Sequence, residues 1–318
     1  NLWIEDNKNK LLIKKLMQWH LHRQWLNIKK FSVLRGVKLI GDIPFYVSRD
    51  SVDVWSNKSL FSISETGELI SQSGVPPDYF SSSGQLWGTP VYEWKNHQKN
   101  KFDWWKKRFK RQFELVDILR LDHFRALESY WVVNGISKNA IKGEWIKSPG
   151  IELLNSLKDY LNVDTLPIIA EDLGVITEAV NNLRDAFDLP GMKILQFAFD
   201  GNKNNPYLPE NIRENNSVVY TGTHDNSTSV SWWDTLDAIL KKEIINKYDF
   251  NNNPAWDLIE LGMKTNAKLF IAPLQDILTL DDKSRLNKPG TTSNNWVWKY
   301  NKSLTDLQPY LQRYGELG

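Results

Sequence analysis

Carboxylate side chains close six short apolar runs in this sequence, and they are the residues best suited to chemistry. They are Asp42, Asp122, Glu171, Asp200, Asp225 and Asp276. Parallel strands covered on both faces read as continuous apolar runs, and the active sites of such folds gather at the carboxyl ends of the strands. We therefore expect an enzyme that carries these acids along one rim.

The segment Leu119-Arg-Leu-Asp-His-Phe-Arg places Arg120 and Asp122 two residues apart. Residues at this spacing on a strand point to the same face. A guanidinium beside a carboxyl group lowers the pKa of that group by roughly one to three units, so Asp122 would be ionised and could act as a nucleophile. A structural salt bridge explains the same pair equally well.

Glu171 follows the apolar run Ile168-Ile-Ala and precedes a turn at Gly174. Partial burial there would raise the pKa of Glu171, as a proton donor requires. The structural alternative is an acid that complements the start of a helix. Further along, residues 224–226 (His-Asp-Asn) gather several polar groups at the end of another run.

Two kinds of chemistry fit such a cluster of acids. Carboxylates at one mouth could hold Mg²⁺ or Mn²⁺ in a lyase or a phosphate-transfer enzyme. Retaining glycoside chemistry instead needs two carboxyl groups about 5–5.5 Å apart. The 15 Trp, 11 Tyr and 13 Phe favour the second, because flat rings with a polar edge suit sugars, although each ring has core packing as its alternative use.

Composition excludes several other classes. A formal net charge of +2 gives no sign of a nucleic-acid partner, and the absence of Cys removes thiolate nucleophiles and Cys-bound zinc. No apolar run approaches the roughly 20 residues of a membrane span, and no signal peptide is present, so we expect a soluble, intracellular protein, either cytoplasmic or in the plastid stroma. The chain starts at Asn1 and enters a helical pattern over residues 21–31, so we expect that it is cut mid-protein.

Alternation of apolar runs with helical patterns favours a parallel α/β fold. No Gly-x-Gly-x-x-Gly follows the first run and no Walker motif is present, so a barrel is the better prediction. Residues 47–101 form a long connection rich in Ser, Gly and Pro that also carries aromatic residues, and we expect an ordered, substrate-covering insertion there. The expected strand runs cover residues 37–40, 116–121, 166–170, 193–199, 218–221 and 269–274, and the clearest helical patterns cover 102–113 and 179–187.

The ordered series of motifs in this chain resembles the amylomaltases, or 4-α-glucanotransferases, of glycoside hydrolase family 77 in the α-amylase clan. The motifs are Gly41-Asp-Ile-Pro-Phe-Tyr-Val, Gly74-Val-Pro-Pro-Asp-Tyr-Phe-Ser, Gly84-Gln-Leu-Trp-Gly, Arg120-Leu-Asp-His-Phe-Arg, Ala170-Glu-Asp-Leu-Gly-Val-Ile-Thr and Thr221-Gly-Thr-His-Asp-Asn. The resemblance runs from about residue 24 to residue 298. It implies a retaining double displacement that transfers α-1,4-glucan segments between malto-oligosaccharides, with no metal and no organic cofactor.

The resemblance also implies a role for each matched residue. Asp122 would be the nucleophile, Glu171 the general acid/base, and Asp225 the carboxylate that grips the sugar hydroxyls. The implied substrate-binding residues are Asp42, Asp78, Gln85, Trp87, Arg120 and His224.

The resemblance has gaps as well as matches. A (β/α)8 barrel needs eight strands and only six runs are found, so we expect a single partial catalytic barrel domain over residues 1–318 that lacks its first two strands. Ala126 and Ser227 stand where the family usually has Gly and often has an acid. An α-amylase-type hydrolase and a non-catalytic glucan-binding fragment therefore stay as alternatives, and oligomeric state is not predicted.

Overall fold

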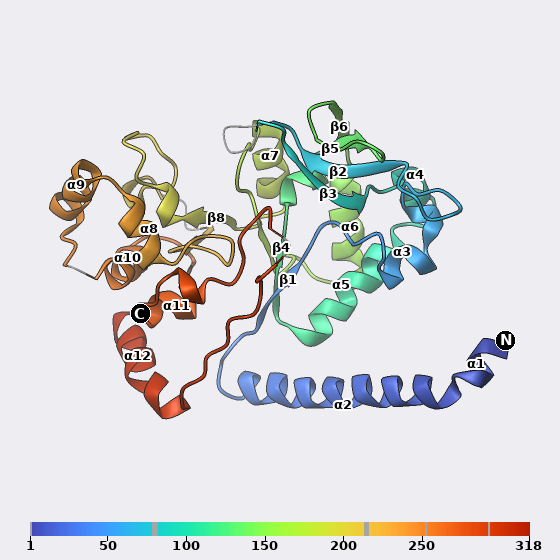
Figure 1. Cartoon of the computed structure of the whole chain (residues 1–318), viewed down its shortest axis with the longest axis horizontal. Helices are drawn as coiled ribbons and strands as arrows, with labels where there is room; N and C mark the ends of the chain where they lie inside the picture. Colours follow the sequence, from blue (N-terminus) through green and yellow to red (C-terminus); the bar gives the residue numbers. More distant parts are fainter. Residues whose placement is uncertain (1, 78–81, 213–215, 252, 292) are drawn as a thin grey trace. The chain divides into compact units, whose positions relative to one another are not determined.

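The computed structural model describes the chain except residues 1, 78–81, 213–215, 252 and 292, and it consists of two compact units, Asn1–Leu189 and Pro190–Gly318. Each unit holds three neighbouring parallel strands together with helices (Figure 1). An α/β fold with parallel strands, as the sequence predicts, is thus confirmed. The prediction of one domain over the whole chain stays a prediction.

The parallel strands of the first unit are β1 (Ile40–Ile43), β4 (Ile118–Leu121) and β7 (Ile168–Ala170). They lie in the order β1-β4-β7, and the register places Asp42 of β1 opposite Arg120 of β4. Strands β4 and β7 are buried almost throughout, which explains why their sequences read as continuous apolar runs. The helices of this unit are α1 (Leu2–Asp6), α2 (Lys8–Val33), α3 (Val52–Ser56), α4 (Trp94–Lys99), α5 (Asp103–Leu115), α6 (Gly150–Leu161) and α7 (Glu178–Ala186), with short 3₁₀ turns η1 (Lys58–Leu60) and η2 (Phe124–Leu127).

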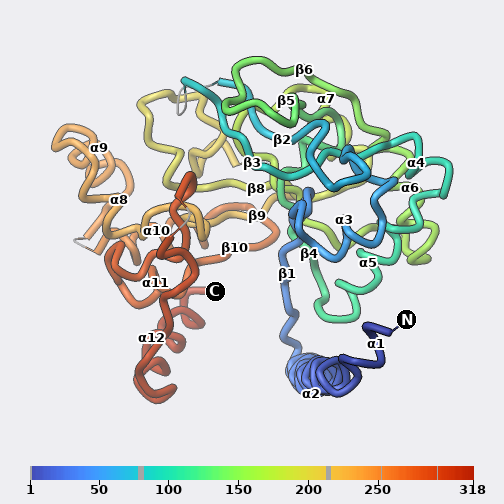
Figure 2. Tube along the Cα trace, turned by 45° about the vertical axis from the view of Figure 1, so that its right-hand side comes forward, coloured from blue at the N-terminus to red at the C-terminus, as the bar shows by residue number. Residues whose placement is uncertain are grey.

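A second, antiparallel sheet in the first unit was not expected from the sequence (Figure 2). Its strands β2 (Ser71–Val75) and β3 (Gln85–Pro90) come from the long connection, and β5 (Ser129–Asn134) and β6 (Gly143–Lys147) come from after β4. The order is β3-β2-β5-β6. The long connection thus owes its order to pairing with a later segment, which no pattern within residues 47–101 reveals.

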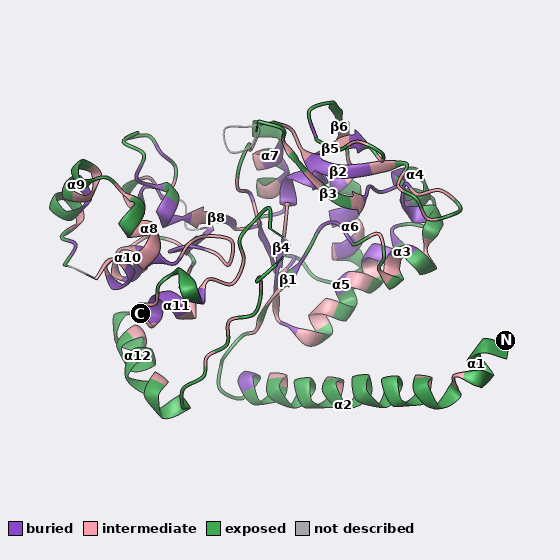
Figure 3. Cartoon of the chain, in the orientation of Figure 1, coloured by how far each residue is buried: buried purple, intermediate pink, exposed green. Residues whose placement is uncertain are grey.

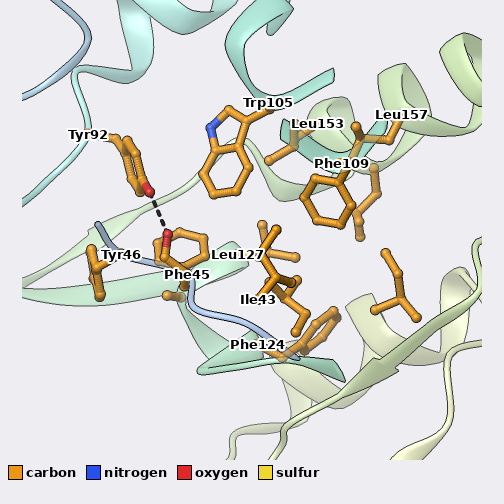
Figure 4. Packing of buried hydrophobic residues seen from close by; sticks show 14 of the residues in the cluster. Ile43, Phe45, Tyr46, Tyr92, Trp105, Phe109, Phe124, Leu127, Leu153 and Leu157 are labelled. Carbon is orange, nitrogen blue, oxygen red and sulfur yellow. Dashed lines mark hydrogen bonds between the residues drawn. The ribbon is translucent and has the colours of Figure 1, made fainter. Parts of the chain in front are cut away.

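Aromatic side chains fill the core of the first unit (Figure 4). Phe45, Tyr92, Trp105 and Phe109 are all almost fully buried, and the Tyr92 hydroxyl donates a 2.5 Å hydrogen bond to the Phe45 carbonyl. Burying each such ring stabilises the fold by roughly 1.5–3 kcal/mol. Core packing therefore accounts for much of the aromatic content.

Helix α2 is longer than the pattern over residues 21–31 indicates, and most of its surface is exposed (Figure 3). Its C-terminal end is anchored beside the end of α5. There, the Trp25 indole N–H donates to the Leu115 carbonyl at 2.7 Å, and the Lys29 ammonium donates to the carbonyls of Phe113 and Val116 at 2.8 and 2.9 Å. Among the described residues, no helix is both long and apolar enough to cross a membrane.

The second unit contains the parallel strands β8 (Gly191–Ile194), β9 (Ser217–Tyr220) and β10 (Leu269–Ile271), with β9 between the other two. Its helices are α8 (Ser229–Thr235), α9 (Ala238–Tyr248), α10 (Pro254–Met263), α11 (Leu274–Ile277) and α12 (Leu304–Leu317), with 3₁₀ turns η3 (Leu195–Phe197), η4 (Pro209–Asn211) and η5 (Asp282–Ser284).

In this unit, two of the strands expected from the sequence end earlier than predicted. The run over residues 269–274 stops being a strand after Ile271, and Asp276 lies inside α11 because Pro273 opens a helix at its N-cap position. The run over residues 193–199 leaves the strand at Ile194 and continues as η3, so Asp200 sits in an exposed turn beyond it.

Candidate active site

A charged triad joins the ends of the first two parallel strands. One Arg120 amino group donates to both oxygens of Asp42, at 2.9 and 2.8 Å, and the other donates to Asp122 Oδ1 at 3.0 Å. Because Asp42 and Arg120 are paired in register, the guanidinium reaches both carboxylates from one place. Burial lowers the pKa of Arg120, but Asp42 and Asp122 raise it by more, so the guanidinium stays protonated. The triad fixes the orientation of the Asp122 carboxylate through a hydrogen bond from a charged donor.

Glu171 follows β7 in a contrasting environment. Its Oε2 accepts a 2.7 Å hydrogen bond from the His123 backbone N–H, and its Oε1 accepts one of 3.0 Å from the Leu173 N–H. Burial and the nearby Asp122 raise the pKa of Glu171 to about 7, against the opposing effects of Arg120 and the two backbone donors. A carboxyl group with this pKa can give and accept a proton near neutral pH, as a general acid/base must.

His123 packs between the insertion and the carboxyl group of Glu171. Its ring meets the Trp87 ring edge-on at 4.8 Å between centroids and lies 6.1 Å from the Tyr46 ring. Burial, with the Arg125 cation, lowers the pKa of His123 to about 3, so the imidazole is neutral. Arg125 in turn donates to the Val175 carbonyl and so ties η2 to the loop that follows Glu171.

Two of the three substrate-binding residues predicted in the insertion fall on one strand. Gln85 and Trp87 lie at the start of β3 and are exposed, with Trp87 at 37% relative exposure. Trp87 thus has one edge against His123 and part of its surface open to solvent. Asp78 lies outside the described residues.

In the second unit, Asp225 sits in the loop after β9. The Asn287 amide donates to Asp225 Oδ1 at 2.6 Å, the His224 Nε2 lies 3.5 Å from the same oxygen, and Arg285 donates to the Asp225 backbone carbonyl at 2.6 Å. The Trp296 ring lies 5.2 Å from that of His224. Asn287 therefore holds the half-buried carboxylate of Asp225, with His224 beside it, and Arg285 holds its backbone.

Asp276 supports this loop instead of facing solvent. Its carboxylate accepts hydrogen bonds from the Thr221 hydroxyl at 2.5 Å and from the Ser229 N–H and hydroxyl at 2.7 Å each. Burial raises the pKa of Asp276, although these donors oppose the shift. Because Thr221 and Ser229 bracket Asp225 in the sequence, Asp276 holds both ends of the segment that carries it. Asp200 only caps its own turn, by accepting from the Asn202 N–H at 2.9 Å.

Sequence reasoning missed the residues that support the predicted acids. Asn287 and Arg285 follow Asp225 by about 60 residues, and no spacing rule connects them. His123 stands directly after Asp122. What distinguishes His123 is its left-handed backbone, which is uncommon for a non-glycine residue and which a sequence does not show. Within the described part of the chain, no group of three His, Asp or Glu side chains is arranged to hold a metal ion.

The first unit therefore offers two carboxyl groups in opposite environments, one beside a guanidinium and one buried. Two acids just beyond the ends of parallel strands, one paired with a guanidinium and one buried, are typical of α/β enzymes that act on glycosidic bonds.

The comparisons with known proteins agree. A family model described as 4-alpha-glucanotransferase matches residues 2–305. The 4-alpha-glucanotransferase of Synechocystis is 47% identical over 302 residues, which are 94% of this chain and 60% of that protein, and that of Thermus thermophilus is 41% identical over 290 residues, 89% and 58% respectively. The crystallised amylomaltase from Streptococcus agalactiae in complex with acarbose superposes with a TM-score of 0.89 at 35% identity, covering 95% of this chain and 61% of that one.

This chain belongs to glycoside hydrolase family 77, the 4-alpha-glucanotransferases. It spans about 60% of the length of the relatives it matches.

Proposed function

We propose that this chain carries the catalytic carboxyl groups of a 4-α-glucanotransferase that moves α-1,4-glucan segments between malto-oligosaccharides. The observation that carries the proposal is the contrast between Asp122, paired with Arg120, and Glu171, buried with a pKa of about 7. Retaining glycoside chemistry requires one ionised nucleophile and one protonated acid. Membership of the 4-alpha-glucanotransferase family supports α-glucans as the substrates.

The first displacement forms a glycosyl ester. An Asp122 oxygen attacks the anomeric carbon of the donor, the bond from that carbon to the leaving oxygen breaks, and Glu171 gives its proton to that oxygen. Arg120 holds the Asp122 carboxylate in place for this attack, because its other amino group is anchored on Asp42.

The second displacement transfers the glycosyl group. Glu171, now deprotonated, removes the proton of the incoming 4-hydroxyl, whose oxygen attacks the anomeric carbon and releases Asp122. Asp225 and His224 grip hydroxyls of the reacting sugar, and Asp42, Asp78, Gln85 and Trp87 serve as further binding residues. Transfer prevails over hydrolysis when a bound acceptor outcompetes water.

We also propose the finer fold, an eight-stranded (β/α)8 barrel of which this sequence lacks the first two strands. The likeness to the amylomaltase from Streptococcus agalactiae supports it, because this chain covers 61% of that structure at a TM-score of 0.89.

Incubation with maltotriose tests the function. The expected products are glucose together with oligosaccharides longer than maltotriose, and the Asp122→Asn variant forms neither. Glucose and maltose without longer products would replace the proposal with a hydrolase.

A non-catalytic glucan-binding fragment is the remaining alternative, and it makes a different prediction. A fluorinated glycosyl donor that slows deglycosylation traps a covalent adduct at Asp122 in an active enzyme. Binding of malto-oligosaccharides without any adduct or product would establish the fragment instead.

A further inference from the structure

His123 connects the insertion to the acid/base group through two different parts of the residue. Its backbone N–H points at Glu171 Oε2 at 2.7 Å, and its ring contacts Trp87. A change in the position of the ring therefore changes the direction of the N–H that holds Glu171.

The backbone of His123 is in the left-handed region, with φ of 53°. This conformation costs a non-glycine residue roughly 1–2 kcal/mol, and it persists only where the surroundings impose it. Here they do so by packing, because the neutral ring forms a cluster with the rings of Tyr46 and Trp87, which also contact each other at 5.8 Å between centroids. The ring atom Nε2 is buried and has no hydrogen-bond partner among the described residues, so no polar contact anchors the imidazole from that side.

Trp87 is able to respond to a ligand. It is 37% exposed, and it stands between Gly84 and Gly88, which both have φ of 66°. A Cβ at Gly88 would meet nothing within 4 Å, so the backbone on that side of Trp87 has open space around it. A sugar ring stacked on the open part of Trp87 would hold this side chain against the His123 ring.

We propose that His123 is a positioning residue through which a sugar bound on Trp87 tightens the hydrogen bond from the His123 N–H to Glu171. This inference rests on the proposed function, in which Glu171 must be a base while the acceptor is attacked. A stronger donor to a carboxylate favours its ionised form. A bound acceptor thus prepares Glu171 to take its proton, whereas water arriving without a sugar on Trp87 finds Glu171 less ready.

The other groups that influence Glu171 lie outside the insertion. Asp122 favours the protonated form, while Arg120 and the Leu173 N–H favour the ionised form. Arg125 faces the imidazole and keeps it neutral. Loosening the His123 N–H therefore leaves burial and Asp122 to dominate, and the affinity of Glu171 for its proton rises.

Three substitutions of His123 separate the parts of the proposal. His123→Phe keeps a ring packed against both Tyr46 and Trp87, and its pH profile and transfer-to-hydrolysis ratio should match the wild type. His123→Ala loses the packing, and the alkaline limb of kcat/KM should move up by about 0.5–1 pH unit, with a roughly three- to tenfold lower ratio of transfer to hydrolysis. His123→Asn tolerates the left-handed backbone but cannot touch Trp87. It should therefore keep the wild-type pH profile and show the same lower transfer-to-hydrolysis ratio as His123→Ala.

Phe102→Ala is the matched control, because Phe102 is also a buried aromatic residue at a left-handed φ of 58°, at the start of α5. Phe102→Ala should lower the free energy of unfolding without changing the pH profile or the transfer-to-hydrolysis ratio. An unchanged pH profile and ratio in His123→Ala would overturn the inference. So would an equal loss of kcat in all three His123 variants at constant pH profile, because that marks a purely structural residue.

A readout without catalysis keeps the inference separate from the proposed function. Carbon-13 NMR titration of the Glu171 carboxyl group, assigned with Glu171→Gln, should show a higher pKa in His123→Ala than in the wild type. A non-cleavable thio-linked maltotetraose should lower the pKa in the wild type alone. If maltotriose gives no transfer but these shifts occur, the proposed function fails and the coupling stands; if transfer occurs without the shifts, the coupling fails.

Discussion

At the scale of single residues, the site depends on two carboxyl groups in contrasting environments. Asp122 is held by Arg120 at 3.0 Å, whereas Glu171 is buried and titrates near pH 7. The same functional group performs opposite tasks because one environment supplies a cation and the other removes water. Two predictions follow directly from Glu171.

Glu171→Gln should abolish activity only toward donors that need a proton. We expect a fall in kcat/KM of at least about a hundredfold with maltotriose, since general acid catalysis contributes roughly 10²–10⁴-fold. With maltosyl fluoride, whose leaving group needs no proton, formation of the glycosyl ester should stay within about tenfold of the wild type. Burst kinetics measure this step, and an equal loss for both donors contradicts the acid role.

Glu171 should also make stability depend on pH. Its pKa in the folded protein is about 7, above the ordinary value of 4.5, so the folded state binds the proton more tightly than the unfolded state. The stability associated with this group is thus fully present below pH 4.5 and is lost as pH rises toward 7, by at most about 3 kcal/mol. Urea unfolding at pH 4.5 and pH 8 measures this. The free energy of unfolding of Glu171→Gln, relative to that of the wild type, should be higher at pH 8 than at pH 4.5. A difference that is constant with pH argues against the burial effect.

Which residues the sequence could predict depends on how local their contacts are. Arg120 and Asp122 are two positions apart on a strand, so their shared face follows from strand geometry, and their hydrogen bond confirms it. Asn287 binds Asp225 across 62 residues, and Arg285 across 60. Such contacts are set by the folded loops and leave no periodic trace.

At the scale of elements, the loop after β9 is held by a helix that sequence reasoning took for a strand end. An apolar run followed by an acid predicts a strand with its acid at the rim, and this holds for β4 and β7. In α11 the run is interrupted by Pro273, and the acid turns inward as Asp276, 1% exposed. Apolar runs of this length do not distinguish a buried strand from a short buried helix.

Asp276→Ala should therefore destabilise the second unit, although Asp276 is not proposed to touch substrate. Its removal leaves the Thr221 hydroxyl and the Ser229 donors without their acceptor, at about 1–3 kcal/mol for each buried group left unpaired. Transfer activity should fall with it, because the loop carrying Asp225 loosens. Asp200→Ala removes an exposed acid from the same unit and should change the free energy of unfolding by less than about 0.5 kcal/mol. Equal effects of the two substitutions would contradict the assignment.

At the scale of the whole molecule, the sequence predicts the parallel strands better than the parts that cover them. Strands β4, β7, β9 and β10 overlap apolar runs that are recognisable by themselves. The expected strand over residues 37–40 is wrong, because β1 (Ile40–Ile43) begins where that run ends and contains Gly41 and Asp42. Strands β5 and β6 acquire their role by extending the pair from the insertion. Helix α2 shows the same limit. Its apolar residues lie on several sides instead of along one stripe, so the pattern predicts a helix without indicating what the helix packs against.

The exposed apolar side chains of α2 should be detectable in solution by dye binding. Leu12, Leu16, Met17 and Trp19 are each about half exposed, and the described hydrogen bonds with α5 and its C-terminal end start from His22 onward. A helix that exposes this many apolar side chains should bind a hydrophobic dye better than a single exposed side chain does. We expect the 318-residue chain to enhance ANS fluorescence and the double variant Leu16→Glu/Met17→Glu to lower that signal clearly. The isolated Ile239→Glu substitution on α9, where the native side chain is 74% exposed, should leave the signal unchanged. Because α2 is anchored through Trp25 and Lys29, the double variant should also keep the circular dichroism of the wild type, and a collapse of helicity would show that the exposed residues hold the fold together.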